Sequence, residues 1–240
     1  MSKIDEIAPD IFRISIFVPQ IEMQFNQFLI RDDEPLLFTT GLKAFFPEMR
    51  EAVARLIDPT RLRWIGFSHF ESDECGSLNQ WLELAPQSEA VTGFVGGMVN
   101  INDFALRPAR MLQHNEALSI GKKQLRYIST PHVPHGWDAG LFYEEGDRTL
   151  LTSDLFHHNG DVEPLTTESL ADRCRETLKG FEQGPLAGYI PYNSKTDRIL
   201  RDLAELRPKT LATMHGSSFS GNGKKAIEEL AEVWQEVLGG

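Results

Sequence analysis

The sequence predicts an α/β fold in which helices cover the outer faces of two packed β-sheets. Short apolar segments separated by turn signals fill the first 40 residues, and strand and helix patterns then alternate toward the C-terminus. The hydrophobic fraction of 41% and the charged fraction of 25% are those of an ordinary globular chain. Because the composition does not change along the 240 residues, a single domain spanning residues 1–240 is expected.

The N-terminal segments have the length and apolar content of strands: Ile11–Val18, Gln24–Ile30 and Leu36–Thr40. The polar stretch Arg31–Pro35 is typical of a hairpin connection. Since strands that are close in sequence usually pair, this part of the chain predicts a mostly antiparallel meander.

The next segments predict a helix, a strand and a second helix. Apolar residues recur at helical spacing over Phe46–Ile57, and the Asp58-Pro59 pair ends that helix. The short apolar run Trp64–Phe67 predicts a buried strand that delivers His69 to its end, and a helix begins near Ser77. A strand end that opens into a loop is a common place for ligand-binding side chains.

The C-terminal half supplies the remaining predicted elements. Strand patterns occur at Leu125–Ser129, Gly140–Glu144, Thr149–Thr152 and Thr210–Met214. Amphipathic patterns predict helices at Thr167–Phe181, Thr196–Leu206 and Lys224–Leu238.

The charge balance and the cysteine content exclude several classes of protein. With 24 Lys and Arg against 35 Asp and Glu, the net charge of −11 disfavours nonspecific binding to nucleic acid or to an anionic membrane. Met1–Asp10 lacks the basic start and apolar stretch of a signal peptide, and no apolar run approaches the length of a membrane span. The 2 cysteines, Cys75 and Cys174, do not form a disulfide framework, so a cytoplasmic location is expected.

Metal-binding residue types occur where apolar segments end, at four places in the chain. His69, Glu71 and Asp73 alternate along one segment, so extended backbone would place their side chains on one side and a loop would bring them closer. The other three places hold His132 and His135 in a loop rich in proline and glycine, Asp154 after Leu150–Ser153, and His215 before a glycine. Taken alone, the first segment is equally well explained as a solvated acidic turn. The repetition at strand ends favours one metal site at one sheet edge.

The motif His-x-Glu-x-Asp, followed by a distant His, an Asp and a C-terminal His-Gly, resembles the metallo-β-lactamase superfamily. Glutamate at its second position resembles the di-iron domain of flavodiiron proteins and the related oxygen-binding di-iron proteins. The order and intervals agree over almost the whole chain, which implies an αββα sandwich of two mixed β-sheets with helices on the outer faces.

The resemblance implies two iron ions joined by an oxo or hydroxo bridge. His69, Glu71 and His135 would hold the first iron, Asp73 and His215 the second, and Asp154 would bridge both. A carboxylate in place of an imidazole makes a site harder and more anionic, which suits iron better than a catalytic zinc. No catalytic side chain is implied apart from the metal centre itself.

Two positions depart from the family pattern or leave a choice. Glu74 stands where the family often has a histidine, and it would ligate the second iron, hydrogen-bond a ligand or face water. His135 is preferred to His132 as the ligand, because His-x-x-Asp followed by an aromatic strand matches the family loop better. His132 would then support a ligand or line the pocket.

Three nearby residues have ordinary explanations as well as functional ones. For Cys75, a role as a small buried residue is a better explanation than a role as a thiolate ligand. His157 and His158 follow Asp154 closely, and a role for one of them in orienting a carboxylate or contacting substrate is as good an account as loop polarity.

The leading hypothesis is a non-haem di-iron protein that binds dioxygen, or nitric oxide, as a sensor or as a reductase-type oxidoreductase. The flavodiiron proteins add a flavodoxin-like domain with flavin, for which 240 residues leave no room, so a separate flavin or rubredoxin-like electron donor is expected. A homodimer is expected from the same resemblance. The alternative function is a metal-dependent hydrolase that uses a metal-bound hydroxide.

Overall fold

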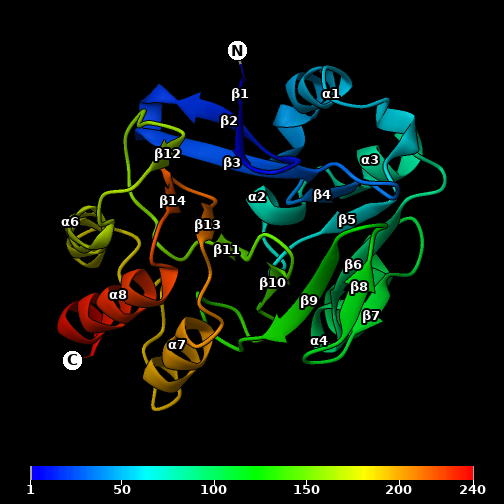
Figure 1. The fold of residues 1–240 in the computed structure, drawn as a ribbon. Helices are drawn as coiled ribbons and strands as arrows, with labels where there is room; N and C mark the ends of the chain where they lie inside the picture. The colour runs from blue at the N-terminus through cyan, green and yellow to red at the C-terminus, as the bar shows by residue number, and fades with distance from the viewer. Residues whose placement is uncertain (1, 240) are drawn as a thin grey trace.

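The computed structural model describes residues 2–239, which form two seven-stranded β-sheets (Figure 1). The first sheet contains, in spatial order, β1 (Lys3–Ala8), β2 (Ile11–Val18), β3 (Met23–Ile30), β4 (Leu36–Phe38), β5 (Trp64–Gly66), β6 (Glu89–Gly93) and β7 (Arg110–Leu112). The second contains β12 (Leu165–Thr166), β14 (Ser218–Ser220), β13 (Thr210–Thr213), β11 (Thr149–Ser153), β10 (Gly140–Glu144), β9 (Gln124–Ser129) and β8 (Ala117–Ser119).

Helices lie mainly between β4 and β7 and after β11. They are α1 (Phe46–Ala54), α2 (Ser72–Cys75), α3 (Leu78–Leu84), α4 (Phe94–Gly96), α5 (Asn102–Phe104), α6 (Ala171–Glu182), α7 (Thr196–Ala204) and α8 (Gly223–Leu238). The remaining helical segments are three short 3₁₀ helices, η1 (Pro19–Ile21), η2 (Lys43–Phe45) and η3 (Pro59–Arg61), and one π-helix, η4 (Gly97–Ile101).

Both sheets are mixed. β1 to β4 pair antiparallel, as the meander predicted, and β4 to β7 then pair parallel. In the second sheet, β8 to β11 pair antiparallel, whereas β11 and β13 are parallel. Parallel pairing aligns the carboxyl ends of β11 and β13 at one edge, which is where Asp154 and His215 follow.

Alternation along the strands produces three apolar layers. Phe28 and Phe38 of the first sheet meet Phe142 of the second in the layer between the sheets. Leu29 and Leu37 face the other way, toward α1 and α3. On the far side, the second sheet packs against α6, α7 and α8, which lie together in Figure 1. The expected αββα sandwich is confirmed.

The sequence patterns found the long elements and missed the short ones. The three N-terminal strands, the strand before His69 and the C-terminal helices are confirmed, with ends that differ by a few residues. The predicted helix at Thr167–Phe181 begins later, at Ala171, because β12 ends only at Thr166. The missed strands are β1, β6, β7, β8, β12 and β14, four of which have two or three residues, too few to show a periodicity. Among the described residues, no helix is both long and apolar enough to cross a membrane.

Candidate metal centre

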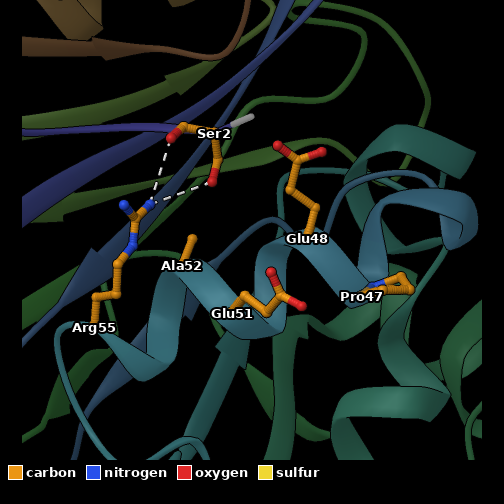
Figure 2. Close-up of a pocket in the computed structure, with 6 residues that line it drawn as sticks. All are labelled: Ser2, Pro47, Glu48, Glu51, Ala52 and Arg55. Atoms are coloured by element: carbon orange, nitrogen blue, oxygen red, sulfur yellow. Dashed lines mark hydrogen bonds between the residues drawn. The ribbon is translucent and has the colours of Figure 1, made fainter.

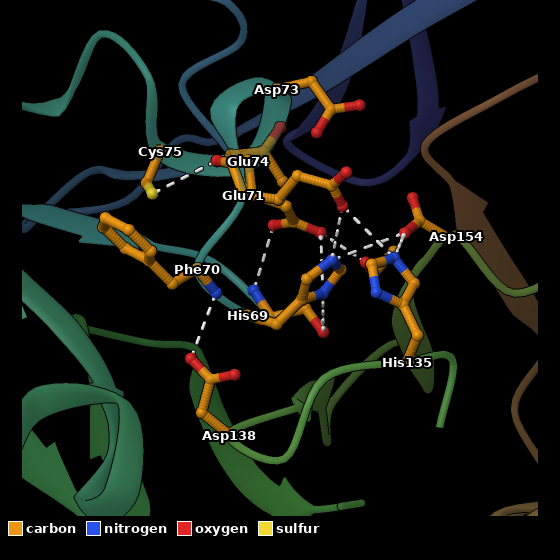
Figure 3. Close-up of polar contacts among 12 residues, drawn as sticks. His69, Phe70, Glu71, Asp73, Glu74, Cys75, His135, Asp138 and Asp154 are labelled. Carbon is orange, nitrogen blue, oxygen red and sulfur yellow. Dashed lines mark hydrogen bonds and ion pairs between the residues drawn. The ribbon is translucent and has the colours of Figure 1, made fainter. Parts of the chain in front are cut away.

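Four separate stretches of chain bring the predicted ligands to one place. His69 follows β5, Asp154 follows β11 directly and His215 follows β13, while His135 lies in the connection between β9 and β10. Figure 3 shows the side chains of His69, Glu71, His135 and Asp154 converging. The strand ends of both sheets therefore build the site together.

The first group consists of His69, Glu71, His135 and Asp154. One potential ligand atom from each lies within 4.8 Å of the others. Oε2 of Glu71 is 3.0 Å from Nε2 of His69 and 3.2 Å from Nε2 of His135. Such a convergence of two imidazoles and two carboxylates fits a single cation with oxygen and nitrogen ligands.

The second group shares Asp154 with the first. Oδ2 of Asp154 is 3.0 Å from Nε2 of His135, whereas Oδ1 is 3.3 Å from Nε2 of His215. Nε2 of His215 is also 3.4 Å from Oδ2 of Asp73. The two oxygens of one carboxylate thus face two different sets of side chains.

The segment His69-x-Glu71-x-Asp73 contributes side chains to both groups: His69 and Glu71 belong to the first, and Asp73 belongs to the second. Glu71 has extended backbone, with φ −142° and ψ 158°, whereas Asp73 lies in the first turn of α2. The change from extended to helical backbone turns the Glu71 side chain toward His135 and the Asp73 side chain toward His215. A single segment therefore contributes to each half of the site.

Opposite charges compensate one another in the absence of a cation. Burial alone would lower the pKa of His135 and of His215, but the contacts of both with Asp154, together with Glu71 and Asp73 respectively, raise each pKa to about 10. Hydrogen bonds with His135 and His69 outweigh burial and lower the pKa of Glu71 to about 2. Burial would raise the pKa of Asp154, but His135 and His215 bring it well below its usual range.

The remaining ring nitrogen of His215 makes the hydrogen bond expected behind a metal ligand. Nδ1 lies 2.9 Å from the backbone carbonyl oxygen of Gln24, which can only accept, so Nδ1 carries the proton. Nε2 is therefore the nitrogen that faces Asp73 and Asp154, and its lone pair would become available to a cation once the second proton leaves. Gly216 follows with φ of 103°, and a Cβ atom there would clash with the His158 ring, which explains the His-Gly pair.

Unpartnered carboxylate atoms show that the donor set fits cations. Oδ1 of Asp73 and Oδ1 of Asp154 are both buried and make no hydrogen bond. Leaving a buried charged acceptor unsatisfied costs several kcal/mol. A metal ion between the two groups would satisfy both atoms, and the six side chains that converge are three imidazoles and three carboxylates.

Glu74 takes a position behind this cluster, at 0% exposure. Its Oε2 accepts a hydrogen bond from the Ser68 backbone N–H at 3.0 Å, and its Oε1 accepts one from the Ser153 hydroxyl. Oε1 is also 3.7 Å from Nδ1 of His69. Burial, the largest influence, raises the pKa of Glu74 to about 7. Of the three roles left open by the sequence, facing water is wrong.

His132 does not join the cluster. It is exposed and has φ of 66°, and its backbone N–H donates to the Gly136 carbonyl in the tight loop that presents His135. Cys75 is buried, and its thiol contacts the Glu71 carbonyl. Burial raises the pKa of that thiol, so Cys75 stays uncharged and acts as a small packing residue, not as a thiolate ligand.

The two histidines after Asp154 have different surroundings. Nδ1 of His158 contacts the Phe156 carbonyl at 2.8 Å and Nε2 accepts from the Ser217 backbone N–H at 2.9 Å, which makes it structural. The His157 ring stacks on the His215 ring with centroids 4.4 Å apart, and its two nitrogens have no hydrogen-bond partner. Burial brings the pKa of His157 well below its usual value.

The ligands predicted from the sequence do not include the polar side chains that hydrogen-bond the loop carrying His215. Asn26 Nδ2 donates to the carbonyls of Thr213 and Gly216, both at 2.8 Å, and Arg13 donates to the Gly216 carbonyl at 3.1 Å. Gln24 and Asn26 are fully buried in strand β3, as is their neighbour Gln27. Polar residues at inward positions of a predicted strand are the signal that would have found them.

A cavity elsewhere in the molecule lacks the chemistry of the metal site. About 550 Å³ in volume, it is lined by Ser2, Pro47, Glu48, Glu51, Ala52 and Arg55 (Figure 2). Arg55 donates to the carbonyl and hydroxyl oxygens of Ser2 across it, at 3.4 and 3.3 Å. The residues that line this cavity include no histidine, so it does not resemble the metal site.

Comparison with known proteins identifies the family of this chain. Residues 23–216 match the family model described as ODP family beta lactamase. The chain belongs to this family. Its relatives include the rubredoxin-oxygen oxidoreductase of Megalodesulfovibrio gigas, 24% identical over 203 residues, which are 82% of this chain and 49% of the relative. They also include the anaerobic nitric oxide reductase flavorubredoxin of Klebsiella pneumoniae, 26% identical over 87% of this chain and 44% of the relative.

Solved structures show the same fold. The rubredoxin oxygen:oxidoreductase of Desulfovibrio gigas superposes with a TM-score of 0.79 at 18% identity, over 96% of this chain and 61% of that one. The fold of this ODP family member is therefore that of the di-iron core of flavodiiron proteins. The chain spans about half the length of the curated relatives it matches.

Proposed function

We propose that this ODP family protein holds two iron ions and that its reduced centre binds dioxygen or nitric oxide. His69, Glu71 and His135 would hold the first iron, Asp73 and His215 the second, and Asp154 would bridge them. The observation that carries the proposal is the division of Asp154, whose Oδ2 faces His135 and whose Oδ1 faces His215. A carboxylate arranged in this way is the natural bridge between two cations.

The donor set favours iron over zinc. Three carboxylates among six ligands give a hard, anionic site, whereas a structural zinc needs only four ligands in a tetrahedron. When bound in the reduced state, an adjacent pair of ferrous ions supplies electrons and open coordination positions for a gas molecule. The names of the relatives, which refer to oxygen and nitric oxide, support this class of ligand.

Residues beside the cluster shape the surroundings for a small ligand. The Tyr189 ring lies 4.8 Å from the His135 ring and 5.8 Å from the Phe181 ring, between centroids. Burial and the charges of Asp154, Glu71 and Asp73 raise the pKa of Tyr189 well above its usual value. Its hydroxyl group therefore stays protonated and is able to donate a hydrogen bond at neutral pH.

The source of electrons decides between a sensor and a reductase. Residues 2–239 account for the metal-binding fold alone, so a flavin or rubredoxin-like donor outside these residues would supply reducing equivalents. Without such a donor, the centre would report the gas by binding it. The cytoplasmic location and the homodimer stay predictions.

Metal analysis joined to anaerobic spectroscopy tests the proposal. Protein supplied with ferrous iron is expected to bind about two irons per chain, and the reduced form should change its visible absorption when exposed to air or nitric oxide. The zinc-loaded protein is the control and should stay colourless. A chain that binds one metal, or that hydrolyses a generic ester with zinc and gives no gas-dependent spectrum, would contradict the proposal and favour the hydrolase.

A further inference from the structure

His157 is a buried imidazole whose two nitrogens have nothing to bond. It is 6% exposed, and neither ring nitrogen has a hydrogen-bond partner in the structure. A neutral imidazole has one donor and one acceptor, and each costs about 1–3 kcal/mol when buried unsatisfied. A phenyl ring would fill the same space without that cost. The adjacent His158 makes the contrast plain, because both of its nitrogens are bonded.

His157 lies directly beside the metal site, in contact with one of its histidines. Its ring stacks on His215 at an interplanar angle of 29°, and Phe181 and Tyr189 contact it edge-on, with centroids 5.1 and 6.4 Å away. The backbone N–H of His157 donates to the Asp154 carbonyl at 3.1 Å. One tight turn therefore presents both the shared carboxylate and this imidazole.

The distances separate His157 from the ligand histidines. His69, His135 and His215 each place Nε2 within 3.5 Å of a carboxylate oxygen of the cluster. Within residues 2–239, no ion-pair contact of up to 4.0 Å joins His157 to a carboxylate. His157 is consequently beside the cluster, against the ring of His215, and not among the side chains that pair with its carboxylates.

We propose that His157 donates a hydrogen bond to the small ligand of the metal pair and is not itself a metal ligand. The inference rests on the proposed di-iron function and adds a residue to it that determines ligand affinity. The ligand class is a small gas or anion with an acceptor atom that projects from the metals, for which azide is a convenient probe. The stacked His215 ring fixes the plane of the donor, so that little conformational entropy is lost on binding.

Substitution His157→Phe tests this role, because phenylalanine keeps the ring and removes both nitrogens. The substituted protein should still bind about two irons per chain, while the dissociation constant for azide on the oxidised protein rises about five- to tenfold, the value of one hydrogen bond. The infrared stretch of bound azide should shift as well. His114→Gln, at an exposed histidine away from the cluster, is the matched control and should leave the iron content, azide affinity and stretch unchanged.

Thermal melting of the metal-free protein adds a readout that does not depend on the iron. Removing an unsatisfied polar group should leave the melting temperature of His157→Phe unchanged or higher than that of the unsubstituted chain. Unchanged azide affinity and stretch, a lower melting temperature, or the loss of one iron would each overturn the inference. Failure of the unsubstituted chain to bind two irons would instead contradict the proposed function, so the two failures are distinguishable.

Discussion

Nδ1 of His215 lies 2.9 Å from the carbonyl oxygen of Gln24, a residue 191 positions earlier in the chain. Asn26, two residues further along the same strand, donates to the carbonyls on both sides of His215, those of Thr213 and Gly216. Strand β3 of the first sheet thus fixes the orientation of a ligand that the second sheet carries. The second half of the metal site depends on contacts between the sheets as well as on its own ligands.

Replacing Asn26 by alanine should weaken this half of the site. The substitution removes two buried hydrogen bonds and leaves the Thr213 carbonyl without this donor, while the Gly216 carbonyl keeps Arg13, so the free energy of unfolding should fall by about 2–3 kcal/mol. Loss of a residue that hydrogen-bonds around a metal ligand typically lowers metal affinity 10- to 100-fold, so the second iron should bind at least about tenfold more weakly than it does in the unsubstituted protein. Denaturant titration and stepwise metal titration measure the two effects.

Asn79→Ala is the matched control for that change. Asn79 also makes two hydrogen bonds with the backbone, to Phe104 and Leu106, but it is only half-buried, whereas Asn26 is fully buried. Its substitution should leave both metal-binding steps unaltered. Equal losses of the two irons in Asn26→Ala would show that β3 supports the whole domain and not the His215 half in particular.

Local signals in the sequence identified the candidate ligands, and long-range contacts decided what each one does. His69, Asp154 and His215 were recognisable because each follows an apolar strand, and strand ends of packed sheets meet at shared edges. Asp73 and Glu74 are adjacent carboxylates of the same chemistry. The Asp73 side chain faces His215, whereas the Glu74 side chain accepts hydrogen bonds from Ser68 and Ser153. That difference depends on α2, a four-residue helix too short to show in a periodicity.

The neighbouring carboxylates Asp73 and Glu74 should therefore respond differently to amide substitution. Asp73→Asn removes a charge that faces His215, so iron content is expected to fall from about two to about one per chain. Glu74→Gln should keep about two irons, because the amide oxygen accepts from Ser68 and the amide nitrogen donates to the Ser153 hydroxyl. Iron analysis after gel filtration distinguishes them, and loss of an iron in Glu74→Gln would make Glu74 a ligand.

The metal-free protein should lose stability as the pH rises above neutrality. His135 and His215, each with its pKa raised to about 10, stabilise the fold fully below the ordinary imidazole value near 6.5 and cease to do so as the pH passes 10. Glu74, with its pKa raised from 4.5 to about 7, likewise stabilises the fold when it is protonated and ceases to do so as the pH rises through 7. Glu71, lowered to about 2, stabilises the fold above pH 4.5 and loses this effect only as the pH falls through 2.

Denaturation of chelator-treated protein between pH 6 and 9.5 measures this alkaline loss. Asp154→Asn, which removes the carboxylate shared by both imidazoles, should flatten the curve. Glu236→Gln, in an exposed pair with Lys179, should leave its shape intact. Stability that rises over this range in the unsubstituted protein would mean that the two imidazoles are uncharged in the metal-free fold.

Metal binding should reverse the sign of this pH dependence, because metal ions compete with protons for the same imidazole nitrogens. At pH 7, His135 and His215 both carry a proton in the metal-free state, since the pKa of each is about 10. Filling the site is expected to release about two protons, and the apparent affinity should rise with pH. Calorimetric titration with ferrous iron under anaerobic conditions, in two buffers of different ionisation enthalpy, gives the number of protons directly. An enthalpy that is the same in both buffers would mean that no proton leaves, and the charged imidazole pair around Asp154 would have to be abandoned.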